Sequence, residues 1–113
     1  MLDKHAFETT ASIASWANTT FGQATNSTAM AIRANEEMAE LLSKCARNAG
    51  SCSILDECAD VIIVLARLVD YYGSSISEIV NQKMAVNRQR RWVVDGNGHG
   101  HHVKDAVNGS SGS

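Results

Sequence analysis

Two pairs of acidic residues have the types and the spacing of a metal site. Glu37 and Glu40 lie in the segment NEEMAELL, and Glu57 and Asp60 lie in DECAD. The members of each pair are three positions apart, so both side chains of a pair share one helix face. The face of Glu57 and Asp60 continues into apolar residues at helical spacing. Because burying unpaired carboxylates is costly, such a face requires a compensating cation or proton.

The two acidic pairs are expected to face each other. A short turn around Gly50 predicts that helices over residues 27–48 and 54–72 run antiparallel. At the helical rise, Glu40 lies ~12 Å from the end of the first helix and Asp60 lies ~10 Å from the start of the second. The pairs therefore reach nearly the same level. Ligation by oxygen alone predicts Mg²⁺, with Mn²⁺ as the alternative, rather than zinc.

The neighbouring acids are open to other interpretations. Asp56 follows Ser53 in an S-x-x-D pattern, which assigns it to capping a helix start. Glu36 lies one residue away from the face of the first acidic pair, so it suits either accepting a proton from an attacking water or a plain surface charge. On spacing alone, the acidic pairs themselves also fit a solvated helix surface.

A basic row follows near the end of the last predicted helix. Its members fall at i, i+4, i+7 and i+8, on one helix face: Lys83, Asn87, Arg90 and Arg91. Cations at a helix C-terminus also favour the helix dipole, which is the structural alternative. Guanidinium groups make planar, bidentate contacts with phosphate, so the row suits a polyphosphate chain. Beside a carboxylate metal site, it predicts metal-assisted attack on a nucleotide polyphosphate.

Four helices are expected to position these groups. Their predicted ranges are 3–18, 27–48, 54–72 and 76–91. Capping patterns at Ser53 and Ser75 start the last two. The second helix is expected to bury the stripe Ala34, Met38, Leu41, Leu42 and Cys45. Beyond Trp92, Asp95 and Gly96 predict a tight turn between short extended pieces. We therefore expect an all-α domain over 1–95 and a Gly/His-rich, partly flexible tail over 96–113.

Composition narrows the classes of function. The chain has 113 residues, of which 44% are apolar and 19% charged, and these values predict one globular domain. The net charge of −2 and the lack of a long basic run argue against nucleic-acid polymers. The longest apolar run, residues 61–66, is far too short to span a membrane. Three cysteines without a C-x-x-C pair match no zinc-site spacing, and Cys45 and Cys58, which lie in helical patterns, are expected to be small buried thiols. We expect a soluble cytoplasmic protein.

Taken in order, these motifs resemble a known family. EExxE at residues 36–40 is followed, after 16 intervening residues, by ExxD at residues 57–60. KxxxNxxRxW then spans residues 83–92. This succession resembles the MazG-type all-α nucleoside triphosphate pyrophosphohydrolases, and the similarity covers residues 27–92. The order and spacing of the motifs make it more specific than either acidic motif alone.

The resemblance implies a function and an assembly. Members of this family hydrolyse a (deoxy)nucleoside triphosphate to the monophosphate and pyrophosphate, which removes unwanted nucleotides. It implies Mg²⁺ ligands at Glu37, Glu40, Glu57 and Asp60, and phosphate ligands at Lys83, Asn87, Arg90 and Arg91. Catalysis would involve a metal-activated water and a nearby glutamate, Glu36 or Glu37. A homodimer, or a tetramer of paired dimers, would complete the helical bundle.

Two questions remain open at this stage. Trp16 is the aromatic residue that we assign to a base pocket, although aromatics at helical spacing also pack in cores. The whole chain also fits a second function, a non-enzymatic helical dimerisation or antitoxin-like regulatory module whose acids and bases pair across an interface. Such a module would not require a divalent cation for stability.

Overall fold

The structure is a computed structural model that describes residues 7–103. The chain divides into two compact units, Met1–Ile79 and Val80–Ser113. The first unit contains three complete helices, α1 (Thr10–Phe21), α2 (Ser27–Ala46) and α3 (Ser51–Tyr71). Helix α4 (Ile76–Gln89) begins in the first unit and continues into the second. The all-α expectation holds for the helices, and a small two-stranded sheet is added to them.

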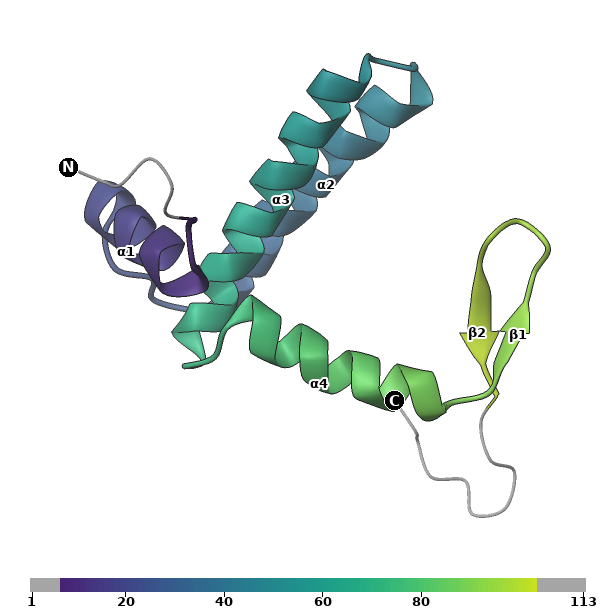
Figure 1. The fold of residues 1–113 in the computed structure, drawn as a ribbon. Coiled ribbons are helices and arrows are strands. Elements are labelled where there is room, and N and C mark those ends of the chain that lie inside the picture. Colours follow the sequence, from purple (N-terminus) through teal and green to yellow (C-terminus); the bar gives the residue numbers. More distant parts are fainter. Residues whose placement is uncertain (1–6, 104–113) are drawn as a thin grey trace. The chain divides into compact units, whose positions relative to one another are not determined.

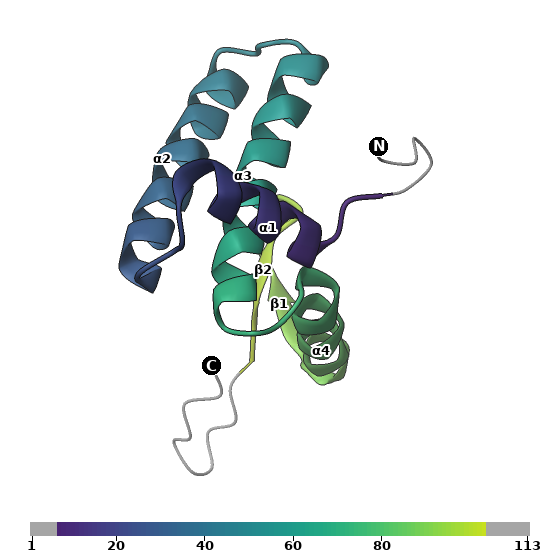
Figure 2. The ribbon, with the colours of Figure 1, turned by 90° about the vertical axis from the view of Figure 1, so that its left-hand side faces the viewer.

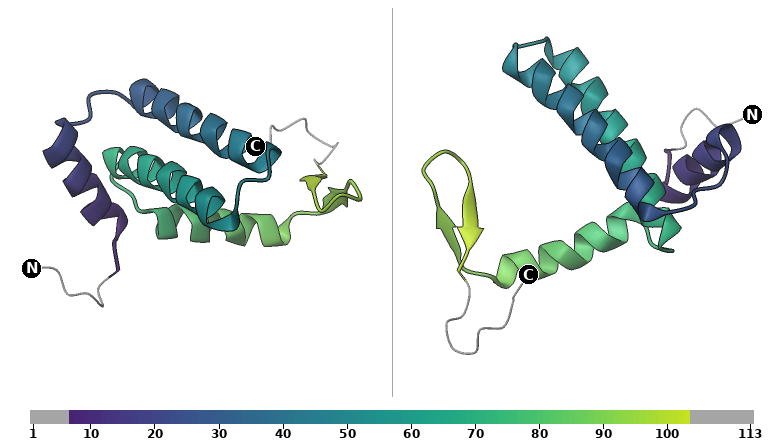
Figure 3. Two further views of the ribbon diagram at one scale, coloured as in Figure 1. Left: turned by 90° about the horizontal axis from the view of Figure 1, so that it is seen from above. Right: turned by 180° about the vertical axis from the view of Figure 1, so that it is seen from behind.

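An antiparallel pair of long helices forms the frame of the first unit. Helices α2 and α3 lie side by side along their length, joined by a short turn at one end (Figures 1 and 3). Helix α1 lies across α3 and contacts it (Figure 2). Small side chains allow this close approach: Ala14 and Ala17 of α1 and Ala66 of α3 are all buried. The predicted antiparallel arrangement of the second and third helices is therefore confirmed.

Helix α1 begins later than periodicity predicts. Thr9 is its N-cap: the Thr9 hydroxyl accepts from the Ser12 backbone N–H at 3.0 Å, and the Ser12 hydroxyl accepts from the Thr9 N–H at 2.7 Å. This reciprocal capping box satisfies two backbone donors and defines the start at Thr10. Phe7 and Glu8 precede the helix. The part of the predicted helix over residues 3–6 lies outside the described residues.

The predicted cap of the third helix is wrong. Helix α3 begins at Ser51, its N-cap is Gly50, and no side chain caps it. Ser53 and Asp56 consequently lie inside the helix, and the capping role proposed for Asp56 does not hold. The turn before α3 depends on Asn48, whose φ of 53° lies in the left-handed region. Asparagine tolerates this conformation better than most residues, and Asn48 follows Arg47, the C-cap residue of α2.

The buried face of α2 differs from the predicted stripe. Its inward positions recur at helical spacing and are buried or half-buried: Met30, Ala34, Glu37, Leu41 and Lys44. Ala34 and Leu41 were expected there. Met38 and Leu42 are 50% and 68% exposed, and Cys45 is exposed as well, so that part of the prediction is wrong. Helix α2 carries two adjacent stripes with apolar residues, and periodicity did not distinguish them.

The apolar core of the first unit is small. Among the residues that the structure describes, Met30 and three alanines are its buried apolar residues. Larger apolar side chains stay exposed on α3 as well as on α2, among them Leu55 at 65% and Ile62 at 51%.

Among the helices of the described range, none has both the length and the apolarity that crossing a membrane requires.

The second unit contains most of α4 and a β-hairpin. Strands β1 (Trp92–Val94) and β2 (Gly100–His102) pair antiparallel, with Val93 opposite His101. The connection is a loop over residues 95–99 rather than the expected two-residue turn. Within the loop, the Asp95 carboxylate accepts from the backbone N–H groups of Asn97 and His99, at 2.8 and 3.1 Å. The hairpin-like tail is confirmed as far as residue 103, and residues 104–113 lie outside the described range.

Candidate metal centre and adjoining cavity

The antiparallel pairing of α2 and α3 brings the two acidic pairs level. Glu40 lies six residues before the last residue of α2, and Glu57 lies six residues after the first residue of α3. Glu37 and Asp60 lie nine residues from the same two helix ends. The two pairs therefore lie at one level, as the sequence predicted, and within them Glu40 is level with Glu57 and Glu37 with Asp60.

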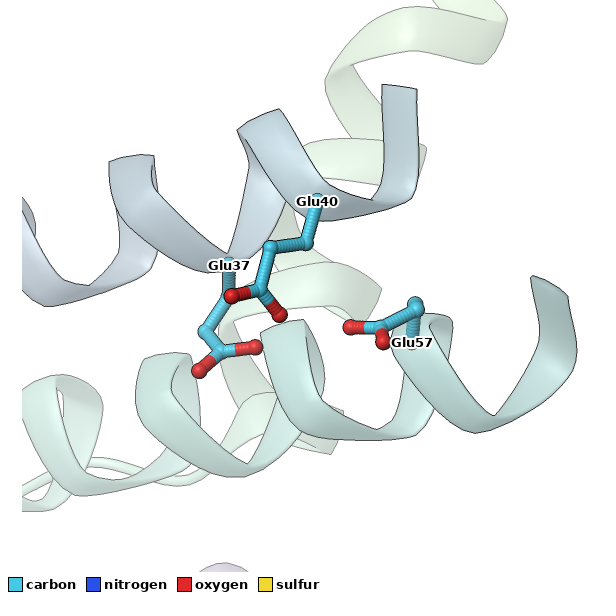
Figure 4. A group of neighbouring side chains, drawn as sticks. All are labelled: Glu37, Glu40 and Glu57. Carbon is cyan, nitrogen blue, oxygen red and sulfur yellow. The ribbon is translucent and has the colours of Figure 1, made fainter. Parts of the chain in front are cut away.

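Three of the four predicted ligands converge. Glu37, Glu40 and Glu57, the acidic cluster, each offer one carboxylate oxygen, and these oxygens lie within 4.8 Å of one another. Figure 4 shows the three carboxylates turned toward a common space between α2 and α3. Asp60 does not belong to this group, but its charge acts on Glu37. The sequence therefore predicted the cluster, and the structure sets Asp60 to one side of it.

Two cations of the chain border the acidic cluster. The Arg33 guanidinium lies 2.5 Å from Oε1 of Glu37, one helical turn away on α2. The Lys44 ammonium lies 2.8 Å from Oε1 of Glu57, across the two helices. The hydrogen bond from Lys44 to Glu57 raises the pKa of Lys44 in the folded protein. The stability that this pair contributes is therefore fully present below the ordinary lysine pKa, and it is lost as the pH rises through the raised pKa of the folded protein.

Both buried carboxylates of the acidic cluster keep one oxygen without a partner. Glu37 is 5% exposed and Glu57 is 6% exposed. Within the described residues, Oε2 of each has no hydrogen-bond partner. Burial raises the pKa of Glu37, Arg33 opposes this, and the charges of Glu40, Asp60 and Glu57 raise it further. A buried, unpartnered carboxylate oxygen is energetically unfavourable, and a bound cation would satisfy it.

Replacing Glu37 by glutamine should make the cation-free protein more stable at neutral pH. The folded pKa of Glu37 is raised above its ordinary value of 4.5, so its contribution to stability is present below that pH and is lost as pH rises through the folded pKa. We expect Glu37→Gln to remove this loss. Urea unfolding in divalent-free buffer from pH 4.5 to 7.5 measures it. Glu36→Gln, an exposed neighbour, is the control, and an unchanged pH slope in Glu37→Gln would contradict the expectation.

A cavity of about 490 Å³ adjoins the acidic cluster. Glu37 lines it and also belongs to the cluster, and Asp60 lines it as well. Other walls come from the aromatic residues Trp16 and Phe21, whose rings pack edge to face with centroids 5.5 Å apart. Arg33 and Arg67 add two positive charges to the lining. The cavity thus combines acidic, basic and aromatic walls within the first unit.

Arg67 ties one wall of the cavity to α3. Its guanidinium donates to the Asn18 side-chain oxygen, at 3.3 Å from Nε and 3.1 Å from Nη2, and also to the Gly22 carbonyl. The Tyr71 hydroxyl donates to the Thr25 carbonyl at 3.3 Å. These bonds join α3 to the end of α1 and to the loop that follows it, and both of these segments line the cavity.

The remaining predicted site residues have separate positions. Glu36 is exposed and lies 3.7 Å from the Arg33 guanidinium, outside the acidic cluster. The basic row belongs to the second unit. Helix α4 ends at Gln89, so Lys83 and Asn87 are helical, whereas Arg90 and Arg91 follow the helix, contrary to the predicted end at residue 91. The Arg91 carbonyl accepts from the Val103 N–H at 2.7 Å, at the base of the hairpin.

Three cationic residues near the site were absent from the sequence prediction. Arg33 lies four residues before Glu37, a spacing that predicts an ion pair, so this contact was accessible from sequence. Lys44 was accessible through the same comparison of helix levels that brought the acids together. Arg67 was not, because its partners depend on how α1 crosses α3.

The acidic cluster fits a small divalent cation. All of its donors are carboxylate oxygens, the ligands that Mg²⁺ and Mn²⁺ prefer, and the cluster contains no thiol or imidazole. The unpartnered Oε2 atoms of Glu37 and Glu57 supply donors that no group of the described chain uses. We find no match for this chain among protein-family models, curated proteins or solved structures.

Proposed function

We propose that the chain is a Mg²⁺-dependent nucleoside triphosphate pyrophosphohydrolase of the MazG-like kind, which removes unwanted nucleotides. The observation that carries the proposal is the acidic cluster, with two buried, unpartnered oxygens, opening onto a cavity with aromatic and cationic walls. The order of the acidic and basic motifs along the chain supports the same proposal.

In this proposal the reaction divides among the chain's residues as follows. Glu37, Glu40 and Glu57 would hold the cation, with Asp60 beside them. Bound Mg²⁺ would supply charge neutralisation for the phosphates and would lower the pKa of a water molecule. The water oxygen bonds to the α-phosphorus, the bond from that phosphorus to the α–β bridging oxygen breaks, and pyrophosphate leaves with the bridging oxygen. A carboxylate takes the proton of the water.

The proton acceptor is assigned to Glu36 or Glu37. Burial raises the pKa of Glu37 in the cation-free protein, and a carboxylate with a raised pKa is a stronger proton acceptor. Glu36 is exposed and free of the acidic cluster. Comparing the pH–rate profiles of Glu36→Gln and the wild type separates the two: only loss of the acidic limb in Glu36→Gln assigns the base to Glu36.

The cavity suits the nucleoside. Trp16 is 56% exposed and Phe21 is 68% exposed, so both rings have free area on which a base can stack. The phosphates are proposed to be contacted by the basic row, Lys83, Asn87, Arg90 and Arg91.

Exposed apolar side chains support a homodimer or a dimer of dimers, since association would bury this apolar surface: Met38, Leu42, Leu55 and Ile62.

Product analysis over a nucleotide panel tests the function. The protein is incubated with Mg²⁺ and canonical or modified deoxynucleoside triphosphates, and the products are separated by chromatography. We expect monophosphate and pyrophosphate in equal amounts. Release of orthophosphate alone, or no turnover of any nucleotide, would falsify the proposal. An absence of turnover together with unchanged thermal stability in Mg²⁺ would favour the non-enzymatic dimerisation module.

A further inference from the structure

Arg33 holds a position between the acidic cluster and the cavity. Its guanidinium is 2.5 Å from Oε1 of Glu37 and 3.7 Å from Oε1 of Glu36. Its side chain is 58% exposed and lines the cavity together with Glu37 and Asp60. Arg33 therefore neutralises a buried carboxylate while keeping most of its surface free for another partner.

We infer that Arg33 binds a phosphate group of the substrate, in addition to neutralising Glu37. This inference rests on the proposed function. A phosphate group held in the cavity beside Glu37 would lie next to the Arg33 guanidinium, because this group is 2.5 Å from the Glu37 carboxylate and lines the same cavity. The planar group can contact both at once, because it has five N–H donors.

The other cations near the site are less suited to this role. Arg67 also lines the cavity, but its guanidinium is occupied by the Asn18 side chain and the Gly22 carbonyl. Lys44 contacts the acidic cluster but is not among the residues that line the cavity. Within the first unit, Arg33 alone among the described residues both contacts the cluster and faces the cavity with an exposed guanidinium.

Binding of inorganic triphosphate, which has no base, tests the role of Arg33. Calorimetric titrations of the full chain are made first with Mn²⁺ alone and then with triphosphate at saturating Mn²⁺. We expect Arg33→Gln to weaken triphosphate binding about 10- to 100-fold, the range of a charge-assisted contact. Binding of Mn²⁺ alone should be no weaker, because the substitution removes a cation from Glu37. Arg33→Lys should recover part of the loss, since it keeps the charge but not the bidentate geometry.

Arg47→Gln is the matched control. Arg47 is exposed and is the C-cap residue of α2, the helix that carries Arg33. Its replacement therefore removes the same charge from a residue that does not line the cavity. Triphosphate affinity unchanged in Arg33→Gln, with altered Mn²⁺ affinity, would show that Arg33 only neutralises Glu37 and would overturn the inference. If the wild type binds Mn²⁺ but no triphosphate, the inference fails while the metal centre stands. If the wild type binds no Mn²⁺, both the inference and the proposed function fail.

Discussion

Under the proposed function, turnover of nucleoside triphosphates should fall at least about a thousand-fold in Glu57→Gln, because the amide would remove one of the buried negative charges proposed to hold the cation. Glutamine has nearly the shape of glutamate, so packing between α2 and α3 should persist. Glu57 is 6% exposed, and its Oε2 has no partner within the described residues, so its charge has no structural use there beyond the pair with Lys44. Initial rates at saturating Mg²⁺, with circular dichroism of the variant, measure the effect.

Asp56→Asn provides the control for this experiment. Asp56 precedes Glu57 on the same helix and is exposed, so its replacement removes an equal charge outside the acidic cluster. We expect Asp56→Asn to retain wild-type turnover and to gain thermal stability in Mg²⁺, as the wild type should. Glu57→Gln should lose this gain in stability, because a ligand stabilises only the state that binds it. Equal loss in both variants would mean that general charge, and not the cluster, supports activity.

Lys44→Gln should bind Mn²⁺ more tightly than the wild type, on the order of tenfold, because the lysine ammonium competes for Glu57. The ammonium lies 2.8 Å from Oε1 of Glu57. The same substitution should destabilise the cation-free protein, since Glu57 then stays buried without its cationic partner. The two effects have opposite signs, and saturating Mn²⁺ should therefore narrow the difference in thermal stability between variant and wild type.

Calorimetry with Mn²⁺ and thermal unfolding with and without the ion measure both effects of Lys44→Gln. Arg47→Gln is again the control, because Arg47 is exposed and forms none of the described ion pairs. Weaker Mn²⁺ binding in Lys44→Gln would contradict competition. It would instead mean that Lys44 positions the Glu57 carboxylate for the cation.

The acidic cluster was predictable because it depends on local rules. The i, i+3 spacing places each pair on one face, and a short turn makes the two helices antiparallel. Helix α3 begins three residues before its predicted start, and α2 ends two residues before its predicted end, so the level partner of Glu40 is Glu57 rather than Asp60. The two boundary errors are small: the end of α2 moved toward its acids, and the start of α3 moved away from its acids.

Other features could not be predicted because they depend on tertiary packing. The sequence of α2 places apolar residues on two neighbouring stripes, and only the approach of α3 selects the one that contains Leu41 and leaves Leu42 exposed. The cavity likewise requires α1 to lie across α3, and small buried side chains on both helices, such as Ala17 and Ala66, permit this approach. Residue types alone do not specify which small residues meet.

The closeness in sequence of the two halves of the acidic cluster also affects how the chain folds. The cluster spans residues 37–57 and lies on one helical hairpin. Closing so short a segment costs little chain entropy, and contacts of low sequence separation form early. The carboxylates should therefore meet in the folding transition state, where their mutual repulsion slows folding. A divalent cation that binds there would accelerate refolding, whereas an ion that bound only the finished fold would act chiefly by slowing unfolding.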